Sequence, residues 1–168
     1  MSDQGRLDPV DFEAKICART ALRARAANLA RPLVLTNGVF DLLHRGHATY
    51  LAQARALGAA LVVAVNSDAS ARRLDKGPVR PVNACADRMA VLAALQSTTL
   101  VSFFDDDTAL AVVEAIRPDI YVKGGDYDVA STMEGRAVSG WGGQVIAIPF
   151  LYQVSSTLLL EKLRDSGR

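Results

Sequence analysis

The sequence has 168 residues, half of them hydrophobic, and a formal net charge of +1 at pH 7. This length fits one domain with a single core, and no apolar run approaches the roughly 20 residues that a membrane-spanning helix needs. Because positive and negative charges nearly balance, neither a nucleic acid nor a membrane surface is an expected partner.

The first 31 residues differ in composition from the rest. They are interpreted as an N-terminal helical extension, followed by one domain over residues 32–168. Residues 11–29 are rich in Ala and Arg and predict one helix that begins near Asp8-Pro9. The Arg31-Pro32 step ends it, because a residue before proline avoids the helical conformation. We expect this helix to pack on the outside of the fold or at a contact between subunits of a homo-oligomer.

The rest of the chain alternates between short apolar runs, typical of buried strands, and segments with apolar residues at helical spacing. Strands are predicted at residues 33–35, 61–65, 99–104, 120–122 and 145–148. Helices are predicted at residues 48–57, 85–96, 132–139 and 155–163, and a further helix ends at Arg117. This alternation predicts an α/β fold with a doubly wound five-stranded parallel sheet, to which the N-terminal helix is an addition.

Two of the segments that connect the predicted elements carry clusters of charged residues. Residues 69–83 are predicted to form a long loop, which carries four basic residues that include Lys76 and Arg80. The acidic triplet Asp105-Asp106-Asp107 precedes the helix that ends at Arg117. We interpret it as the cap of that helix rather than as a cation site, because carboxylates complement the positive end of a helix dipole.

The turn after the first strand holds both histidines of the chain, His44 and His47, with Gly46 between them. Ligands bind at such turns in open α/β sheets, and the free amides of a helix N-terminus suit phosphate. Gly46 lets a phosphate approach the backbone, and two imidazoles that can be cationic near neutral pH add donors. The turn is therefore interpreted as a phosphate site. The alternatives are a histidine pair that only caps the helix and a metal site with Asp41.

The loops that follow parallel strands lie on one edge of the sheet, so we expect them to meet. These loops are residues 44–47, 66–80 and 123–126, together with the helix start at 155–157. Lys123 directly follows a strand and precedes two glycines, which favours a functional role over that of a surface charge. The hydroxyls of Ser155, Ser156 and Thr157 are interpreted as a helix cap or as a second phosphate site.

Nucleotidyl transfer to an acceptor phosphate would suit these residues. Such an acceptor is already largely ionised at neutral pH, because its second pKa is about 6, so no general base is required. The protein must align two anions and stabilise charge on the α-phosphate. His44, His47, Lys76, Arg80 and Lys123 are the groups available for this task. Mg²⁺ carried on the triphosphate would share the work, and no metal site built from protein ligands is expected.

The stretch Gly38-Val39-Phe40-Asp41-Leu42-Leu43-His44-Arg45-Gly46-His47 resembles the signature of the H-x-G-H nucleotidyltransferases. Over roughly residues 33–164, four further motifs resemble the heptose-1-phosphate adenylyltransferases of that family. They are Val65-Asn66-Ser67-Asp68-Ala69-Ser70, Arg80-Pro81-Val82-Asn83, Asp87-Arg88-Met89-Ala90-Val91-Leu92 and Val122-Lys123-Gly124-Gly125-Asp126-Tyr127. The resemblance implies a Rossmann-like nucleotidyltransferase fold and AMP transfer from ATP to a heptose 1-phosphate, with pyrophosphate release, for bacterial lipopolysaccharide synthesis. The chain would be the stand-alone form, because nothing of the size of a kinase is attached.

The resemblance also implies roles for individual residues. His44 and His47 would hold the triphosphate and the transition state, and Lys76 would reach a phosphate, which makes these three the catalytic candidates. The candidates for nucleotide binding are Thr36, Asn37, Gly38, Phe40, Gly46, Lys123, Gly124, Asp126, Ser155, Ser156 and Thr157. The candidates on the sugar-phosphate side are Asp41, Arg80 and Arg88.

The last motif departs from the family pattern. Related transferases often carry an arginine shortly after the Ser/Thr cluster, whereas Leu158-Leu159-Leu160 stands here and Lys162 is the nearest cation. Two other functions stay open: a cytidylyltransferase acting on a polyol phosphate such as glycerol 3-phosphate, and a nucleotide-binding module without turnover. The expected partners are ATP and a sugar phosphate. The unpaired Cys17 and Cys85 fit a reducing compartment, so a cytoplasmic location is expected.

Overall fold

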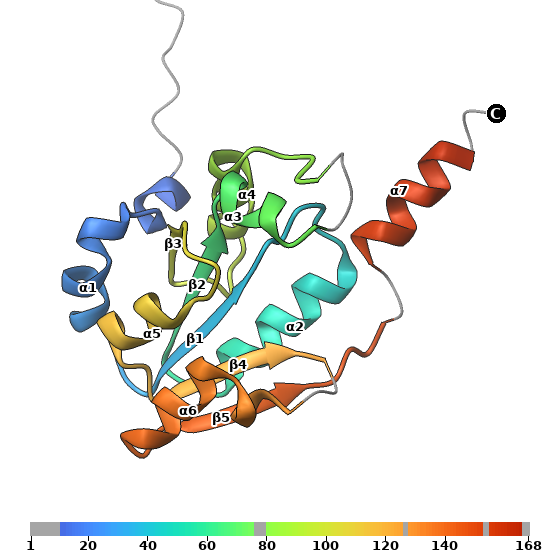
Figure 1. The fold of residues 1–168 in the computed structure, drawn as a ribbon. Helices are drawn as coiled ribbons and strands as arrows, with labels where there is room; N and C mark the ends of the chain where they lie inside the picture. The colour runs from blue at the N-terminus through green and yellow to red at the C-terminus, as the bar shows by residue number, and fades with distance from the viewer. Residues whose placement is uncertain (1–10, 76–79, 126–127, 153–154, 166–168) are drawn as a thin grey trace, which may run out of the picture.

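The computed structural model describes residues 11–75, 80–125, 128–152 and 155–165, which form a five-stranded parallel sheet in the order β3-β2-β1-β4-β5 (Figure 1). The strands are β1 (Leu33–Gly38), β2 (Ala60–Asn66), β3 (Leu100–Phe104), β4 (Ile120–Gly124) and β5 (Gln144–Ile148). The chain runs outward from β1 to β3 and returns to the other side of β1 with β4. The predicted doubly wound sheet is confirmed, and its strand order reverses between β1 and β4.

Helices cover both faces of the sheet. The α-helices are α1 (Arg19–Ala27), α2 (Arg45–Ala56), α3 (Asp68–Arg73), α4 (Cys85–Ala93), α5 (Leu110–Ile116), α6 (Met133–Gly140) and α7 (Ser156–Asp165). Two 3-10 helices are η1 (Asp11–Lys15) and η2 (Val129–Ser131). In the ranges that the structure describes, no helix combines the length and the apolar character needed to cross a bilayer.

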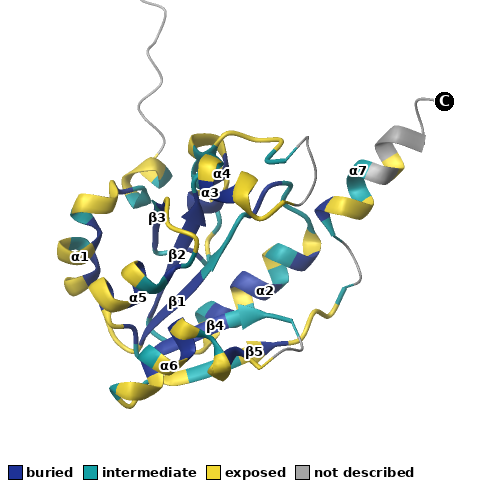
Figure 2. Ribbon diagram, in the orientation of Figure 1, coloured by how far each residue is buried: buried dark blue, intermediate teal, exposed yellow. Residues whose placement is uncertain are grey.

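The central strands β1 and β2 begin with continuous apolar runs because their successive side chains enter two different cores. Leu33 and Leu35 point to the face covered by α1, α5 and α6, whereas Val34 points to the face covered by α2 and α4. All three side chains are fully buried, and β2 and the first part of β1 are dark blue in Figure 2. Burial on both faces explains why the strands could be recognised as short continuous apolar runs.

The expectation of a single helix over residues 11–29 is wrong. The segment forms η1 and α1, and between them Ile16 makes a parallel bridge with Val101 of β3. The Cys17 amide donates a hydrogen bond to the Val101 carbonyl over 2.9 Å. The backbone is drawn into this pairing, which a helix excludes. α1 then packs on the outer face beside α5, where Leu22 and Ala26 are buried.

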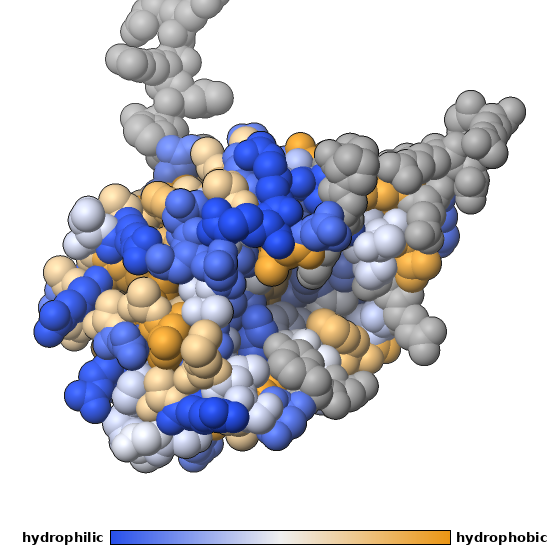
Figure 3. Space-filling view, viewed as in Figure 1, coloured by the Kyte–Doolittle hydropathy of each residue, from blue (hydrophilic) through white to orange (hydrophobic). Residues whose placement is uncertain are grey.

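The expectation of a long loop over residues 69–83 is wrong for residues 69–73, because these residues belong to α3 (Asp68–Arg73). Ser67 caps this helix, since its hydroxyl accepts a hydrogen bond from the Ser70 amide over 3.0 Å. Short polar residues such as Ser67 favour N-cap positions, so the sequence does carry a signal for this helix start. Hydrophilic side chains gather over α3 in Figure 3.

The acidic triplet does not cap α5. The N-cap position is Ala109, and its amide donates to Oε1 of Glu134, a residue of α6, over 2.9 Å. The three aspartates bind other partners: Asp105 accepts from Ser67, Asp106 pairs with Arg19 and Asp107 pairs with Arg73. A carboxylate from a distant helix therefore stabilises the start of α5, and sequence proximity was misleading.

Candidate functional site

A cavity of about 410 Å³ opens at the carboxyl ends of β1 and β4, where the strand order reverses. Ligands bind at this position in open α/β sheets. The cavity is lined by Asn37, Gly38, Val39, Phe40, Asp41, His47, Tyr50, Arg80, Lys123, Gly124, Phe150 and Ser156. The loops after β1 and β4, Arg80 and the start of α7 thus meet at one place.

The two histidines lie at the start of α2. His44 is the N-cap residue and His47 belongs to the first turn, so the helix begins three residues before its predicted start. Their rings stack with centroids 3.9 Å apart and planes 23° apart, and Phe40 meets His47 edge-on. A Cβ atom on Gly46 would lie 3.0 Å from the His44 ring, so a glycine between the histidines permits this stacking.

Burial lowers the pKa of both histidines. For His47 the pKa falls to about 4, because burial disfavours its charged form and a charge on His44 would repel it. His47 is therefore mainly neutral near neutral pH in the ligand-free protein. The Nδ1 atoms of both rings are buried and have no hydrogen-bond partner among the residues described. An anion placed against these rings would favour their protonated form.

Lys123 forms the cationic floor of the cavity at the end of β4. Its Nζ donates to the backbone carbonyl of Asn37 over 3.1 Å and to Oδ1 of the same residue over 3.2 Å. Tyr121 also donates to Oδ1 of Asn37, over 2.7 Å. Asn37 therefore holds the ammonium group between β1 and β4. Thr36 is fully buried below the cavity, where its hydroxyl is 2.6 Å from that of Tyr50.

Asp41 and Arg80 form the opposite wall. Asp41 is 4% exposed, and its Oδ1 accepts from the amides of Val82 and Asn83 over 2.8 and 3.0 Å. Arg80 donates to Oδ2 of Asp41 over 3.4 Å and to the Thr157 hydroxyl over 2.9 Å. Asp41 thus fixes the segment that carries Arg80, and Arg80 connects this wall with α7.

The three hydroxyls at the start of α7 have separate functions. Ser155 caps the helix and accepts from the Leu158 amide over 3.2 Å. Ser156 is buried, lines the cavity and donates to the Leu42 carbonyl over 3.1 Å. Thr157 binds Arg80. From this base α7 projects away from the sheet in Figure 1, and Leu158 is exposed.

Six described candidate residues are not among those that line the cavity: Thr36, His44, Gly46, Arg88, Ser155 and Thr157. Arg88 is buried behind the wall and is not among the lining residues. Lys76 and Asp126 lie outside the described residues, so their predicted roles stay predictions. In the described part of the chain, no group of three or more His, Cys, Asp or Glu side chains is placed to hold a metal ion.

Sequence reasoning missed two aromatic lining residues, Tyr50 and Phe150. Tyr50 lies three residues after His47 on α2, and this spacing places both on one helix face. Phe150 follows the end of β5 by two residues, so it lies on the ligand-binding edge, and its ring contacts the position of a Cβ atom on Gly124. The sequence signals that could identify them are the helical spacing of Tyr50 from His47 and the position of Phe150 just after a predicted strand.

The chain is similar to known proteins over most of its length. Residues 35–161 match the family described as cytidylyltransferase-like. The D-beta-D-heptose 1-phosphate adenylyltransferase of Bordetella bronchiseptica is 54% identical over 156 residues, which cover 92% of this chain and 96% of that protein. The bifunctional protein HldE of Hahella chejuensis is 51% identical over 132 residues, which cover 79% of this chain and 28% of that longer protein.

Solved structures share the architecture. The lipopolysaccharide core biosynthesis protein from Thermoplasma volcanium matches with a TM-score of 0.60 and 27% identity, over 73% of this chain and 98% of that chain. A pantothenate synthetase from Thermus thermophilus matches with a TM-score of 0.59 over 90% of this chain and 70% of that chain. Its identity of 17% shows a common fold alone.

Proposed function

The chain belongs to the cytidylyltransferase-like family, and we propose that it transfers AMP from ATP to a heptose 1-phosphate. The products are ADP-heptose, a precursor for lipopolysaccharide, and pyrophosphate. One observation carries this function: the identity of 54% to a heptose 1-phosphate adenylyltransferase, over nearly the whole length of both proteins. The lining supports it chemically, because Arg80, Lys123 and His47 are groups that can bind phosphate.

The transfer is a substitution at phosphorus. An oxygen of the acceptor phosphate attacks the α-phosphorus of ATP, the bond from that phosphorus to the bridging oxygen breaks, and pyrophosphate leaves with the electron pair. The acceptor oxygen is already ionised, so none of the cavity residues has to remove a proton. Alignment of the two anions and stabilisation of the developing charge remain as the tasks of the protein.

The nucleotide side of the site consists of α2 and Lys123. The first-turn amides of α2 and the rings of His44 and His47 bind the triphosphate, since a helix N-terminus attracts anions. Lys123, held by Asn37, neutralises charge on the transferred phosphate. Mg²⁺ enters as part of the Mg–ATP substrate and supplies further charge neutralisation there. Gly38, Phe40, Gly124 and Ser156 shape the cavity around the nucleotide.

The sugar-phosphate side consists of Asp41 and Arg80. Arg80 provides a guanidinium for the acceptor phosphate, and Lys76 adds a second cation. Asp41 orients Arg80 through Oδ2, and a sugar hydroxyl would share this oxygen with the guanidinium. A cytoplasmic location is expected, because ATP is supplied there.

A substrate panel tests this function. Pyrophosphate release is measured with ATP, CTP, GTP and UTP, each against D-glycero-β-D-manno-heptose 1-phosphate, hexose 1-phosphates and glycerol 3-phosphate. The expected result is turnover with ATP and the heptose 1-phosphate. Preference for CTP with glycerol 3-phosphate would establish a polyol-phosphate cytidylyltransferase instead. Nucleotide binding without pyrophosphate release from any pair would indicate a binding module.

A further inference from the structure

Arg88 is the most deeply buried charged side chain near the site, although it is not a lining residue of the cavity. It lies on α4, is 2% exposed, and its side chain has no accessible surface. A buried guanidinium is tolerated only when its charge is paired and its N–H groups are hydrogen-bonded. The partners of Arg88 therefore show what it does.

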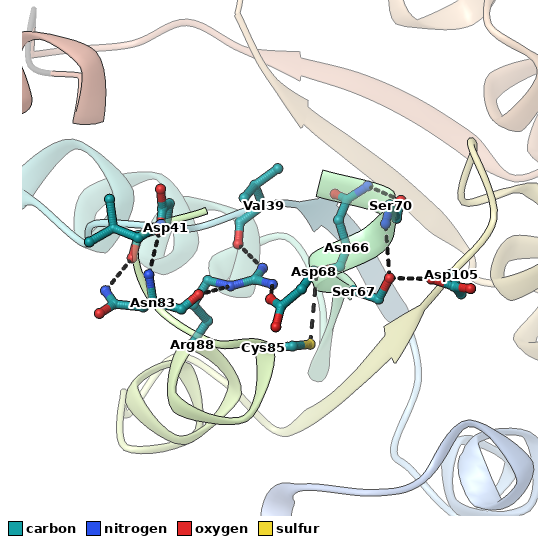
Figure 4. A network of polar contacts seen from close by, with 11 residues as sticks. Val39, Asp41, Asn66, Ser67, Asp68, Ser70, Asn83, Cys85, Arg88 and Asp105 are labelled. Atoms are coloured by element: carbon teal, nitrogen blue, oxygen red, sulfur yellow. Dashed lines mark hydrogen bonds and ion pairs between the residues drawn. The ribbon is translucent and has the colours of Figure 1, made fainter. Parts of the chain in front are cut away.

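Each of the three nitrogens of Arg88 binds a different segment (Figure 4). Nε donates to the Asn83 carbonyl over 3.0 Å, one terminal nitrogen donates to the Val39 carbonyl over 2.6 Å, and the other pairs with Oδ1 of Asp68 over 2.7 Å. Asp68 is the first residue of α3, whose start is fixed by the Ser67 cap. One planar group thus connects the loop after β1, the segment before α4 and the start of α3.

Two of these segments also meet at Asp41. The amide of Asn83 donates to Oδ1 of Asp41, and the Asn83 side chain donates to the Asp41 carbonyl over 2.8 Å. Val39 and Asp41 belong to the same loop and both line the cavity. Arg88, Val39, Asp41 and Asn83 therefore form a closed ring of contacts behind the wall that carries Arg80.

We infer that Arg88 is a positioning residue for the acceptor side of the transfer site: it holds the Val39 and Asn83 backbones so that Asp41 and Arg80 face the sugar phosphate. This inference rests on the proposed transfer function. Arg88 does not line the cavity, and none of its three hydrogen-bond partners is His47 or Lys123. A displacement of reacting groups by about 1 Å can cost roughly 100-fold in rate, so a small shift of this wall is enough to matter.

Arg88→Lys is the discriminating variant. It keeps the positive charge opposite Asp68 but replaces a planar fork by a single ammonium group, which cannot reach three partners in the same geometry. We expect kcat/KM for the sugar phosphate to fall roughly 10- to 100-fold while the Kd for ATP, measured by calorimetry, changes less than threefold. Arg73→Lys is the matched control, because Arg73 also binds a carboxylate and a backbone carbonyl but lies away from the cavity.

Three outcomes would overturn the inference. They are a folded Arg88→Lys protein with kcat/KM within twofold of wild type, an equal loss of ATP affinity, and an equal effect of Arg73→Lys. If Arg88→Lys does not fold, Asp68→Asn tests the placement of Arg88 instead, since it removes only the charge of the partly exposed partner of its guanidinium. A loss of about threefold or more in kcat/KM for the acceptor is then expected, with unchanged ATP affinity; unchanged kcat/KM contradicts the inference.

Hydrogen exchange separates this inference from the proposed function. The amides of Val82 and Asn83, which bind Asp41, should exchange about tenfold faster in Arg88→Lys, whereas the amides of β2 should not change. This measurement needs no substrate. If the wild-type protein released no pyrophosphate from any pair, the transfer function would fail, and unchanged exchange at these two amides would separately refute the role of Arg88 in holding the wall.

Discussion

The rings of His44 and His47 stack 3.9 Å apart at the start of α2, and a charge on one disfavours a charge on the other. The ligand-free site therefore holds neutral imidazoles near neutral pH, beside the positive end of a helix. A bound triphosphate reverses this balance, because an anion favours the protonated rings. Proton uptake and nucleotide binding are coupled in this arrangement.

The free energy of unfolding should fall as the pH falls from 6.5 towards 4. In this window the unfolded chain protonates His47 at its ordinary pKa of 6.5, whereas the folded protein, with a pKa of about 4, does not. Urea unfolding at pH 7.5, 6 and 5 measures the effect. The fall should be smaller in His47→Gln, and identical pH profiles for both proteins would contradict the assigned pKa.

His44→Ala and His47→Ala should each lower turnover roughly 10²- to 10³-fold, the usual loss for one group that stabilises a transition state. Their position at an anion-binding helix start is the reason. Pyrophosphate release measures turnover, and circular dichroism checks the fold. A variant that folds normally and keeps near wild-type turnover would show that its histidine takes no part in catalysis.

Lys123→Met should weaken ATP binding and slow the transfer. The ammonium group is fixed by Asn37 on the nucleotide side of the cavity, so its loss leaves negative phosphate charge uncompensated. Calorimetric titration with ATP measures the affinity. Lys15→Met is the control, because Lys15 also donates to a backbone carbonyl, that of Leu95, away from the cavity. Equal behaviour of the two variants would reduce Lys123 to a general surface charge.

Gly124→Ala should impair nucleotide binding by changing the cavity wall. The new Cβ atom would lie 2.6 Å from the Phe150 ring and 3.4 Å from the Tyr50 ring. Phe150 is 57% exposed, so its ring can move away from the new Cβ atom and the fold should persist. Because Phe150 lines the cavity, this movement of its ring changes the shape of the cavity. Gly140→Ala is the control, since a Cβ atom there has no neighbour within 4 Å. ATP affinity equal to wild type in both variants would argue against this wall as a binding surface.

The sheet and the turn around His44 were predictable because each depends on local pattern. Continuous apolar runs such as residues 61–65 are buried on both faces, and the strand-to-helix turn contains its own glycine and histidines. The convergence of Lys123 and Arg80 on this turn followed from a topological rule about strand ends. Predicting the sheet, the turn and the position of these two cations required no knowledge of individual side-chain contacts.

Long-range pairings account for what could not be predicted. Glu134 caps α5 from another helix, which no spacing near Ala109 reveals. The resemblance places Arg88 on the sugar-phosphate side, and no local pattern reveals its hydrogen bonds to Val39, Asp68 and Asn83. Ile16 interrupts a strongly helical composition because a carbonyl of β3 is available to its neighbour, Cys17. In each case contacts between distant elements decide the structure, and at Ile16 such a contact outweighs the helix propensity of the segment.

The bridge between Ile16 and Val101 also bears on the behaviour of the protein at high concentration. β3 is an outer strand of the sheet, and such strands offer unpaired backbone groups to the strands of other molecules. The N-terminal segment pairs with this edge strand at Val101, and the Cys17 amide satisfies the Val101 carbonyl from within the same chain. A chain shortened past Cys17 would present this border to its neighbours, and its first defect would be self-association through strand pairing rather than loss of the transfer site.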